Sequence, residues 1–147
     1  MSAIGAIFNL HQRPFAKEDL RVLTALWHGL HKWGPDGGRI VTTDFAGVCY
    51  QAFHTNREAR FEKQPLVDPD GRILAADVRL DNRADLFAAT HSLLNGRSTD
   101  ADYLMAAHTR WGEVFPFHVV GEYAFALYDP RERRLLLSRD HIGARPL

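Results

Sequence analysis

An apolar run at the start of the chain, from Ser2 to Phe8, constrains the fold more than any other stretch. It alternates poorly between polar and apolar positions, which predicts a strand covered on both faces. A chain end frays unless it is tied down, so we expect this end to have a function or a partner. If Met1 is removed, Ser2 gains an α-amine beside its hydroxyl, the minimum equipment of an N-terminal nucleophile. The alternative is a polar residue left at the end of a core strand.

The composition predicts one ordinary globular domain over residues 1–147. The 18 Lys and Arg balance the 18 Asp and Glu, so the charge indicates neither a nucleic-acid nor a membrane partner. Cys49 is the one cysteine, which excludes an internal disulfide and fits a reducing compartment. The His residues show no metal-site spacing beside it, and we expect no metal. Since the sequence has neither a signal-peptide pattern nor an apolar run of membrane length, we expect a cytoplasmic protein.

Hydrophobic spacing and capping residues predict three helices. They cover residues 16–33, 82–94 and 98–111. Gly34-Pro35 ends the first, because the residue before a proline avoids the α region. The second has its N-cap at Asp81 or Asn82 and a glycine, Gly96, where the helix should stop.

Runs of β-forming residues predict the strands, which lie at 2–8, 39–43, 47–53, 64–67, 72–80, 123–128 and 135–138. The last pair gives the clearest hairpin. The segment His54–Lys63 is polar, shows no period and is predicted to be a loop. Because helices and strands stand mostly in blocks, the fold class is α+β with antiparallel sheets. Two sheets stacked between helical layers would bury the Ser2 strand.

Four stretches together resemble a known family, and they are Ser2–Phe8, Gly34-Pro35-Asp36, Gln64-Pro65-Leu66 and the closing run 121–129 with 138–147. The chain is similar to the class II glutamine amidotransferase domain of the asparagine synthetase family. This resemblance implies a four-layer αββα sandwich, the fold of N-terminal-nucleophile hydrolases. It also implies a domain cut from a longer protein that continues into a synthetase domain. We therefore expect ATP and Mg in that missing domain and no cofactor in this one.

The synthetase domain is the partner that the resemblance implies, together with the small molecule or peptide that it takes as substrate. A homodimer is a further possibility. The acceptor substrate is selected by the missing domain, so the present sequence does not identify it.

The resemblance places a glutamine site in this chain and shows where the chain departs from it. The family needs a Cys nucleophile at the mature terminus and an oxyanion hole from an Asn side chain and a Gly N–H. Ser2 stands at the nucleophile position, and Asp77-Val78-Arg79 stands where the family has Asn-Gly-Glu. Asp77 would repel a developing oxyanion, and Val78 would crowd a position where glycine lets substrate approach. Arg79 inverts the charge of the family's Glu.

Two more positions concern the binding of glutamine itself. Asp100 matches the acid that holds the glutamine amino group, although it could equally complement the dipole at a helix start. The arginine that holds the glutamine carboxylate is missing from the expected strand, Cys49–His54. The nearest arginines in the sequence are Arg57 and Arg60.

Two of these motifs also have purely structural readings. Asp77 and Arg79 could pair with Asp81, Arg83 or each other on a solvated strand end. The glycine-rich segment around Pro35 could be a surface turn, or it could let the backbone approach a ligand closely.

The lead hypothesis is a glutaminase-like domain that no longer hydrolyses glutamine and forms the structural half of an ATP-dependent amide-forming enzyme. The departures at Ser2 and residues 77–79 fit members resembling β-lactam synthetases or lasso-peptide cyclases, which use an amine within their own substrate. One alternative is an active glutamine-hydrolysing amidotransferase domain, or serine hydrolase, with Ser2 as its nucleophile. Another is a docking module that binds a partner protein or leader peptide through the loop His54–Lys63.

Overall fold

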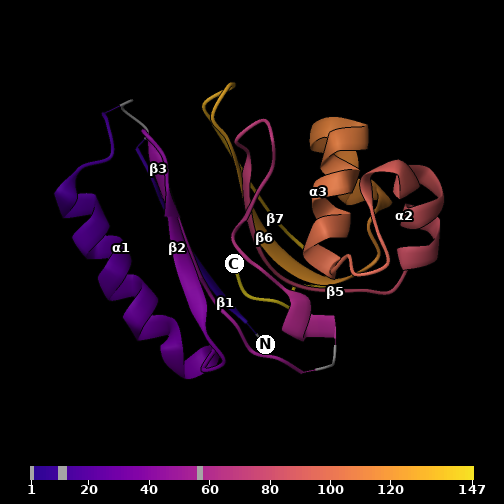
Figure 1. Ribbon diagram of the computed structural model, residues 1–147, viewed down its shortest axis with the longest axis horizontal. Helices are drawn as coiled ribbons and strands as arrows, with labels where there is room; N and C mark the ends of the chain where they lie inside the picture. Colours follow the sequence, from indigo (N-terminus) through magenta and orange to yellow (C-terminus); the bar gives the residue numbers. More distant parts are fainter. Residues whose placement is uncertain (1, 10–12, 56–57) are drawn as a thin grey trace.

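The computed structural model describes residues 2–9, 13–55 and 58–147, and its elements form four layers (Figure 1). Two antiparallel sheets stack face to face. Helix α1 covers the outer face of one sheet, and helices α2 and α3 cover the outer face of the other. This arrangement confirms the predicted α+β fold with αββα layers.

The first sheet has the strand order β1-β3-β2, with β1 at Ala3–Phe8, β2 at Gly38–Thr42 and β3 at Ala46–Gln51. Its central strand β3 is buried along its whole length. The predicted N-terminal strand is confirmed as β1, which lies at the edge of the sheet and is mostly half-buried. Helix α1 contacts one face of β1 and strand β5 of the second sheet contacts the other, so both faces are covered.

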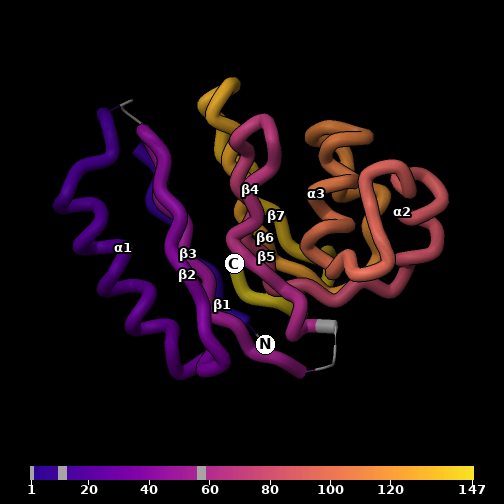
Figure 2. The backbone as a smooth tube through the Cα atoms, in the orientation of Figure 1, coloured from indigo at the N-terminus to yellow at the C-terminus, as the bar shows by residue number. Residues whose placement is uncertain are grey.

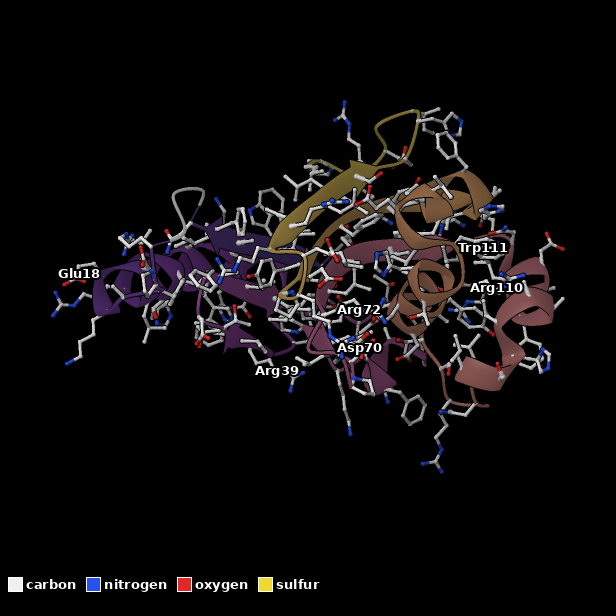
Figure 3. All side chains as sticks on the ribbon, turned by 90° about the horizontal axis from the view of Figure 1, so that it is seen from above. Glu18, Arg39, Asp70, Arg72, Arg110 and Trp111 are labelled. Carbon is white, nitrogen blue, oxygen red and sulfur yellow. The ribbon has the colours of Figure 1, made fainter. Side chains whose placement is uncertain are left out.

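The second sheet has the order β4-β5-β6-β7, with β4 at Leu66–Val67, β5 at Ile73–Leu80, β6 at Gly121–Asp129 and β7 at Arg134–Arg139. Both predicted hairpins are present, and the tube in Figure 2 follows their tight turns. Arg72 closes the first turn by pairing with Asp68 at 2.6 Å and with Asp70 at 3.4 Å (Figure 3). Arg39, also labelled there, donates to the carbonyls of Lys63 and Pro65 and so links β2 to the segment before β4.

The helices are α1 at Lys17–Leu30, α2 at Arg83–Thr90 and α3 at Asp100–Trp111. Helix α1 continues as a 3-10 turn, His31–Trp33, and α2 as another, His91–Leu93. Helix α2 and its 3-10 turn therefore end before Gly96, which corrects the prediction that the second helix stops at that glycine. The predicted start of α3 is confirmed, because Asp102 accepts a 2.7 Å hydrogen bond from the backbone nitrogen of Thr99.

Two further 3-10 segments were absent from the prediction, Glu58–Phe61 and Gly112–His118. The first lies inside the segment predicted as the loop His54–Lys63. Asn82 stands at the N-cap position of α2, as predicted, but its side chain does not cap the helix. It bonds instead to the carbonyl of His118 and the backbone nitrogen of Val120, which ties α2 to the segment before β6.

Strand β5 belongs to two hydrophobic clusters at once. Its residues Leu74 and Ala76 pack on the side of α2 and α3, whereas Ile73 and Ala75 pack between the two sheets. All four side chains are almost fully buried. The alternation follows from the two-residue repeat of a strand, and it decides which of the later β5 residues face the first sheet.

Close backbone packing explains one of the glycines before β2. A Cβ atom added at Gly34 would lie 2.3 Å from the carbonyl oxygen of Gln51, so the chain needs glycine there to approach its own strand β3. Asp36 in the same turn accepts a 2.7 Å hydrogen bond from the backbone nitrogen of His54. The close approach that Gly34 allows is thus to the chain itself.

Candidate functional site

A polar pocket of about 100 Å³ lies where the chain start meets β5 and the beginning of α3. All the predicted site residues line it, namely Ser2, Asp77, Val78 and Asp100. They come from segments that are far apart in the sequence, and the fold brings them together. The volume has room for several water molecules or a small polar solute.

Ser2 is fixed by three hydrogen bonds. Its backbone nitrogen donates to Asp77 Oδ1 at 3.0 Å, and its hydroxyl accepts from the backbone nitrogen of Phe53 at 3.1 Å. The same hydroxyl lies 2.9 Å from the Tyr50 hydroxyl. Burial raises the pKa of Tyr50, so the phenol stays neutral and keeps its proton.

Asp77 lies opposite a cation that comes from the segment after β7. Its Oδ2 is 3.3 Å from Nη1 of Arg145, whose Nη2 is 3.1 Å from Glu122. The side chains of Asp77 and Arg145 are only 13% and 17% exposed. Burial raises the pKa of Asp77, and the positive charge of Arg145 opposes that rise. Asp140 holds the backbone in place by accepting from the nitrogens of Ala144 and Arg145.

The neighbours of Asp77 on β5 have different environments. Val78 lines the pocket and also packs against the cluster beneath α2 and α3. Arg79 is half-exposed and pairs with Asp81 at 3.3 Å and with Glu122 at 3.2 Å. The suggested pairing of Arg79 with Asp81 is thus present, whereas the partner of Asp77 is Arg145, which the sequence reading did not name.

Both carboxylate oxygens of Asp100 are engaged. Oδ2 accepts from the backbone nitrogen of Leu80 at 3.1 Å, and Oδ1 accepts from Nε of Arg83 at 2.5 Å. Asp100 is 7% exposed and fastens the start of α3 to the end of β5. The contacts of Asp100 are therefore structural, and its role in binding the glutamine amino group stays a prediction.

The strand expected to hold the glutamine carboxylate, Cys49–His54, has no arginine, and the nearest ones in the sequence are Arg57 and Arg60. Arg57 lies outside the described residues, and Arg60 does not line the pocket. The arginines that do line it are Arg79, Arg83 and Arg145.

Glu62 and Gln64 were missed as parts of the pocket wall. Gln64 Nε2 donates to Glu62 at 2.9 Å and to the carbonyl of Ala76 at 2.8 Å, and its Oε1 accepts from the Ala76 nitrogen at 2.6 Å. Thr99 also donates to Glu62, at 3.3 Å. The sequence signal for this part of the pocket wall was the Gln64-Pro65-Leu66 motif. It marked the position of Gln64 but did not reveal the hydrogen-bond partners of its side-chain amide.

Glu62 makes stability depend on pH. Burial raises its pKa from 4.5 to about 7 in the folded protein, although the bond from Gln64 opposes the rise. Below pH 4.5 the acid is protonated in both states, and between the two pKa values only the unfolded chain ionises it. Its contribution to stability is therefore present at pH 4.5 and lost as the pH rises to 7. We expect a loss of roughly 3 kcal/mol across this window.

Urea unfolding of Glu62→Gln and of the unchanged protein at pH 5 and pH 8 measures this contribution. The variant should gain stability relative to the unchanged protein as the pH rises. Glu132→Gln, in the exposed turn after β6, is the matched control and should show no such change. An equal pH response in the unchanged protein and Glu62→Gln would refute the assignment to Glu62.

The described part of the chain contains neither a candidate metal site nor a candidate membrane-spanning helix. No group of three or more His, Cys, Asp or Glu there could hold a metal ion. No helix among those residues is long and apolar enough to cross a membrane.

Comparisons with known proteins agree on one family. A family model described as "Glutamine amidotransferase domain" matches residues 53–147. Asparagine synthetase (glutamine-hydrolyzing) 2 of Bacillus subtilis (strain 168) is 24% identical over 100% of this chain and 20% of its own length. A putative asparagine synthetase (glutamine-hydrolyzing) of Mycobacterium tuberculosis (strain ATCC 25618 / H37Rv) is 26% identical over 82% of this chain and 18% of its own length. The chain thus spans about a fifth of the length of these relatives.

Proposed function

Because the chain belongs to the class II glutamine amidotransferase domains of the asparagine synthetase family, we propose that it is a glutaminase-like domain that does not hydrolyse glutamine. It serves as a structural half of an ATP-dependent amide-forming enzyme. The greater length of the relatives supports a covalently linked synthetase domain, which would bind ATP and Mg and select the acceptor. We also propose that the protein works in the cytoplasm.

The observation that carries this proposal is the hydrogen bond from the Ser2 nitrogen to Asp77. An N-terminal nucleophile needs its own amine as the base that takes the hydroxyl proton. If Met1 is removed, the Ser2 nitrogen becomes an α-amine, and a carboxylate 3.0 Å away favours its protonated form. An ammonium group cannot accept a proton from the hydroxyl. Asp77 therefore disables the base that an N-terminal serine would need.

Asp77 also opposes the second requirement of the reaction. Attack on an amide places negative charge on the carbonyl oxygen, and enzymes stabilise that charge with aligned hydrogen-bond donors. Loss of one such donor slows catalysis by about 10²–10³. In this pocket a carboxylate stands beside Ser2 in place of a donor, and it is held there by Arg145.

The combination of Ser2 and Asp77 suits enzymes that need no ammonia. Members resembling β-lactam synthetases or lasso-peptide cyclases join a carboxylate to an amine within their own substrate. A domain retained for its fold would keep β1 between α1 and β5, as this one does, without keeping the chemistry at the strand's end. We place the protein among such members.

Glutamate release tests the proposal. The full-length protein and its Ser2→Ala variant are incubated with glutamine, and we expect both to release glutamate only at the background rate. Turnover that disappears in Ser2→Ala would instead support the active alternative, which the position of the Ser2 hydroxyl in the pocket favours. Intact-mass analysis adds a check, because retention of Met1 blocks any N-terminal chemistry.

A further inference from the structure

The carboxylate of Asp77 occupies a place that is built for an anion. One oxygen takes the N–H of Ser2 and the other faces Arg145. Arginine carries five N–H donors, and carboxylates are the partners that its planar group matches best. Within the described residues, Nε of Arg145 is buried and has no hydrogen-bond partner, so the guanidinium has donor capacity to spare.

The cation is held in position by its own segment. Asp140 accepts hydrogen bonds from the backbone nitrogens of Ala144 and Arg145, and Gly143 adopts a positive φ of 69° that closes the turn. Glu122 contacts the far side of the guanidinium at 3.1 Å and is more exposed than Asp77. The fixed backbone of this segment and the contact with Glu122 therefore orient the guanidinium toward the pocket.

We propose that Arg145 and the Ser2 nitrogen form a site for a small carboxylate, and that Asp77 fills this site from within the chain. Arg145 is then the specificity-determining cation of the pocket, on a different element from the strand where an arginine was expected. The proposal deepens the proposed function, because the internal carboxylate fills the space beside Ser2 that the amide group of a glutamine would need. A tethered group always has the advantage of high effective concentration over a free one.

Chemical rescue tests the site directly. Asp77→Ala in the full-length protein removes the carboxylate and leaves space that formate can fill. We expect formate to raise the melting temperature of Asp77→Ala by about 3–6 °C when it is present at tenfold its dissociation constant. Sodium chloride at equal ionic strength should not do so, and the unchanged protein should show no formate-specific shift.

Two second-site variants identify the cation. The formate effect should vanish in Asp77→Ala/Arg145→Met, which removes the guanidinium. It should persist in Asp77→Ala/Glu122→Gln, which alters the far side of the guanidinium and the exposed pair of Glu122 with Arg79. The proposal is overturned if formate and chloride act alike on Asp77→Ala, or if the formate effect survives the loss of Arg145.

A measurement with Asp77 intact covers the case in which Asp77→Ala does not fold. NMR titration of ¹³C-labelled aspartate in Arg145→Met should show a higher pKa for Asp77 than in the unchanged protein, because Arg145 lowers it. An unchanged pKa would exclude Arg145 as the partner. Neither experiment contains glutamine, so a protein that proves to hydrolyse glutamine refutes the proposed function and leaves the anion site to be judged by formate alone.

Discussion

Gln64→Ala should lower the free energy of unfolding by about 3 kcal/mol, because it strips two buried backbone groups of their partners. Strand β4 pairs with β5 only at Leu66–Leu74 and Val67–Ile73. Further along, the side-chain amide of Gln64 bonds to both the nitrogen and the carbonyl of Ala76 and so replaces the missing strand. Ala76 is 1% exposed, so solvent does not compete for these bonds while Gln64 is in place.

Gln51→Ala is the matched comparison. Gln51 is also buried, but among the described residues its Nε2 donates only to the carbonyl of Trp27, and its Oε1 has no hydrogen-bond partner there. Urea unfolding should show a clearly smaller loss for Gln51→Ala than for Gln64→Ala. Equal losses would mean that side-chain volume, and not the pairing with Ala76, determines the effect.

Phe115→Ala should be at least as destabilising, by about 4 kcal/mol. Phe115 is 0% exposed, stacks on Phe125 of β6 with ring centroids 5.1 Å apart, and contacts the ring of His108 edge-on. Its removal would leave a cavity between α3 and the second sheet, in the cluster that also holds Leu74 and Ala76. Calorimetry should show the corresponding fall in melting temperature.

Phe117→Ala is the internal control for this cavity. Phe117 lies two residues further along the same 3-10 segment and is 90% exposed. Its replacement should change stability by no more than about 0.5 kcal/mol. A large effect at Phe117 would show that another part of the full-length protein packs on this segment.

The sequence was sufficient to predict elements with a strong period. Strand β1 and the hairpin of β6 and β7 are long apolar runs between clear turn residues, and α1 has an apolar stripe at helical spacing. The segment that carries Phe115 was missed because it has no period that distinguishes it from a loop, and Pro116 stands in its middle. Its buried ring is fixed by α3 and β6, which local spacing cannot reveal.

The site was predictable only where a motif marked it. Ser2, Asp77 and Asp100 follow from the family resemblance, and the structure places them around one pocket. The ion pair between Asp77 and Arg145 joins residues that are far apart in the sequence, so no local pattern predicts it. Likewise, the raised pKa of Glu62 results from burial by residues distant in sequence.

The alternation of β5 between its two clusters has a consequence for how this site can change. Ile73 and Ala75 face the first sheet, and Asp77 is the next residue on that face, whereas Val78 belongs with Leu74 and Ala76. Loss of one residue within β5 would exchange the two faces and carry a carboxylate into the helix-side core. Substitutions at position 77 can therefore change the chemistry of the pocket. Insertions and deletions in β5 cannot, because they would disrupt the packing on both faces of the strand.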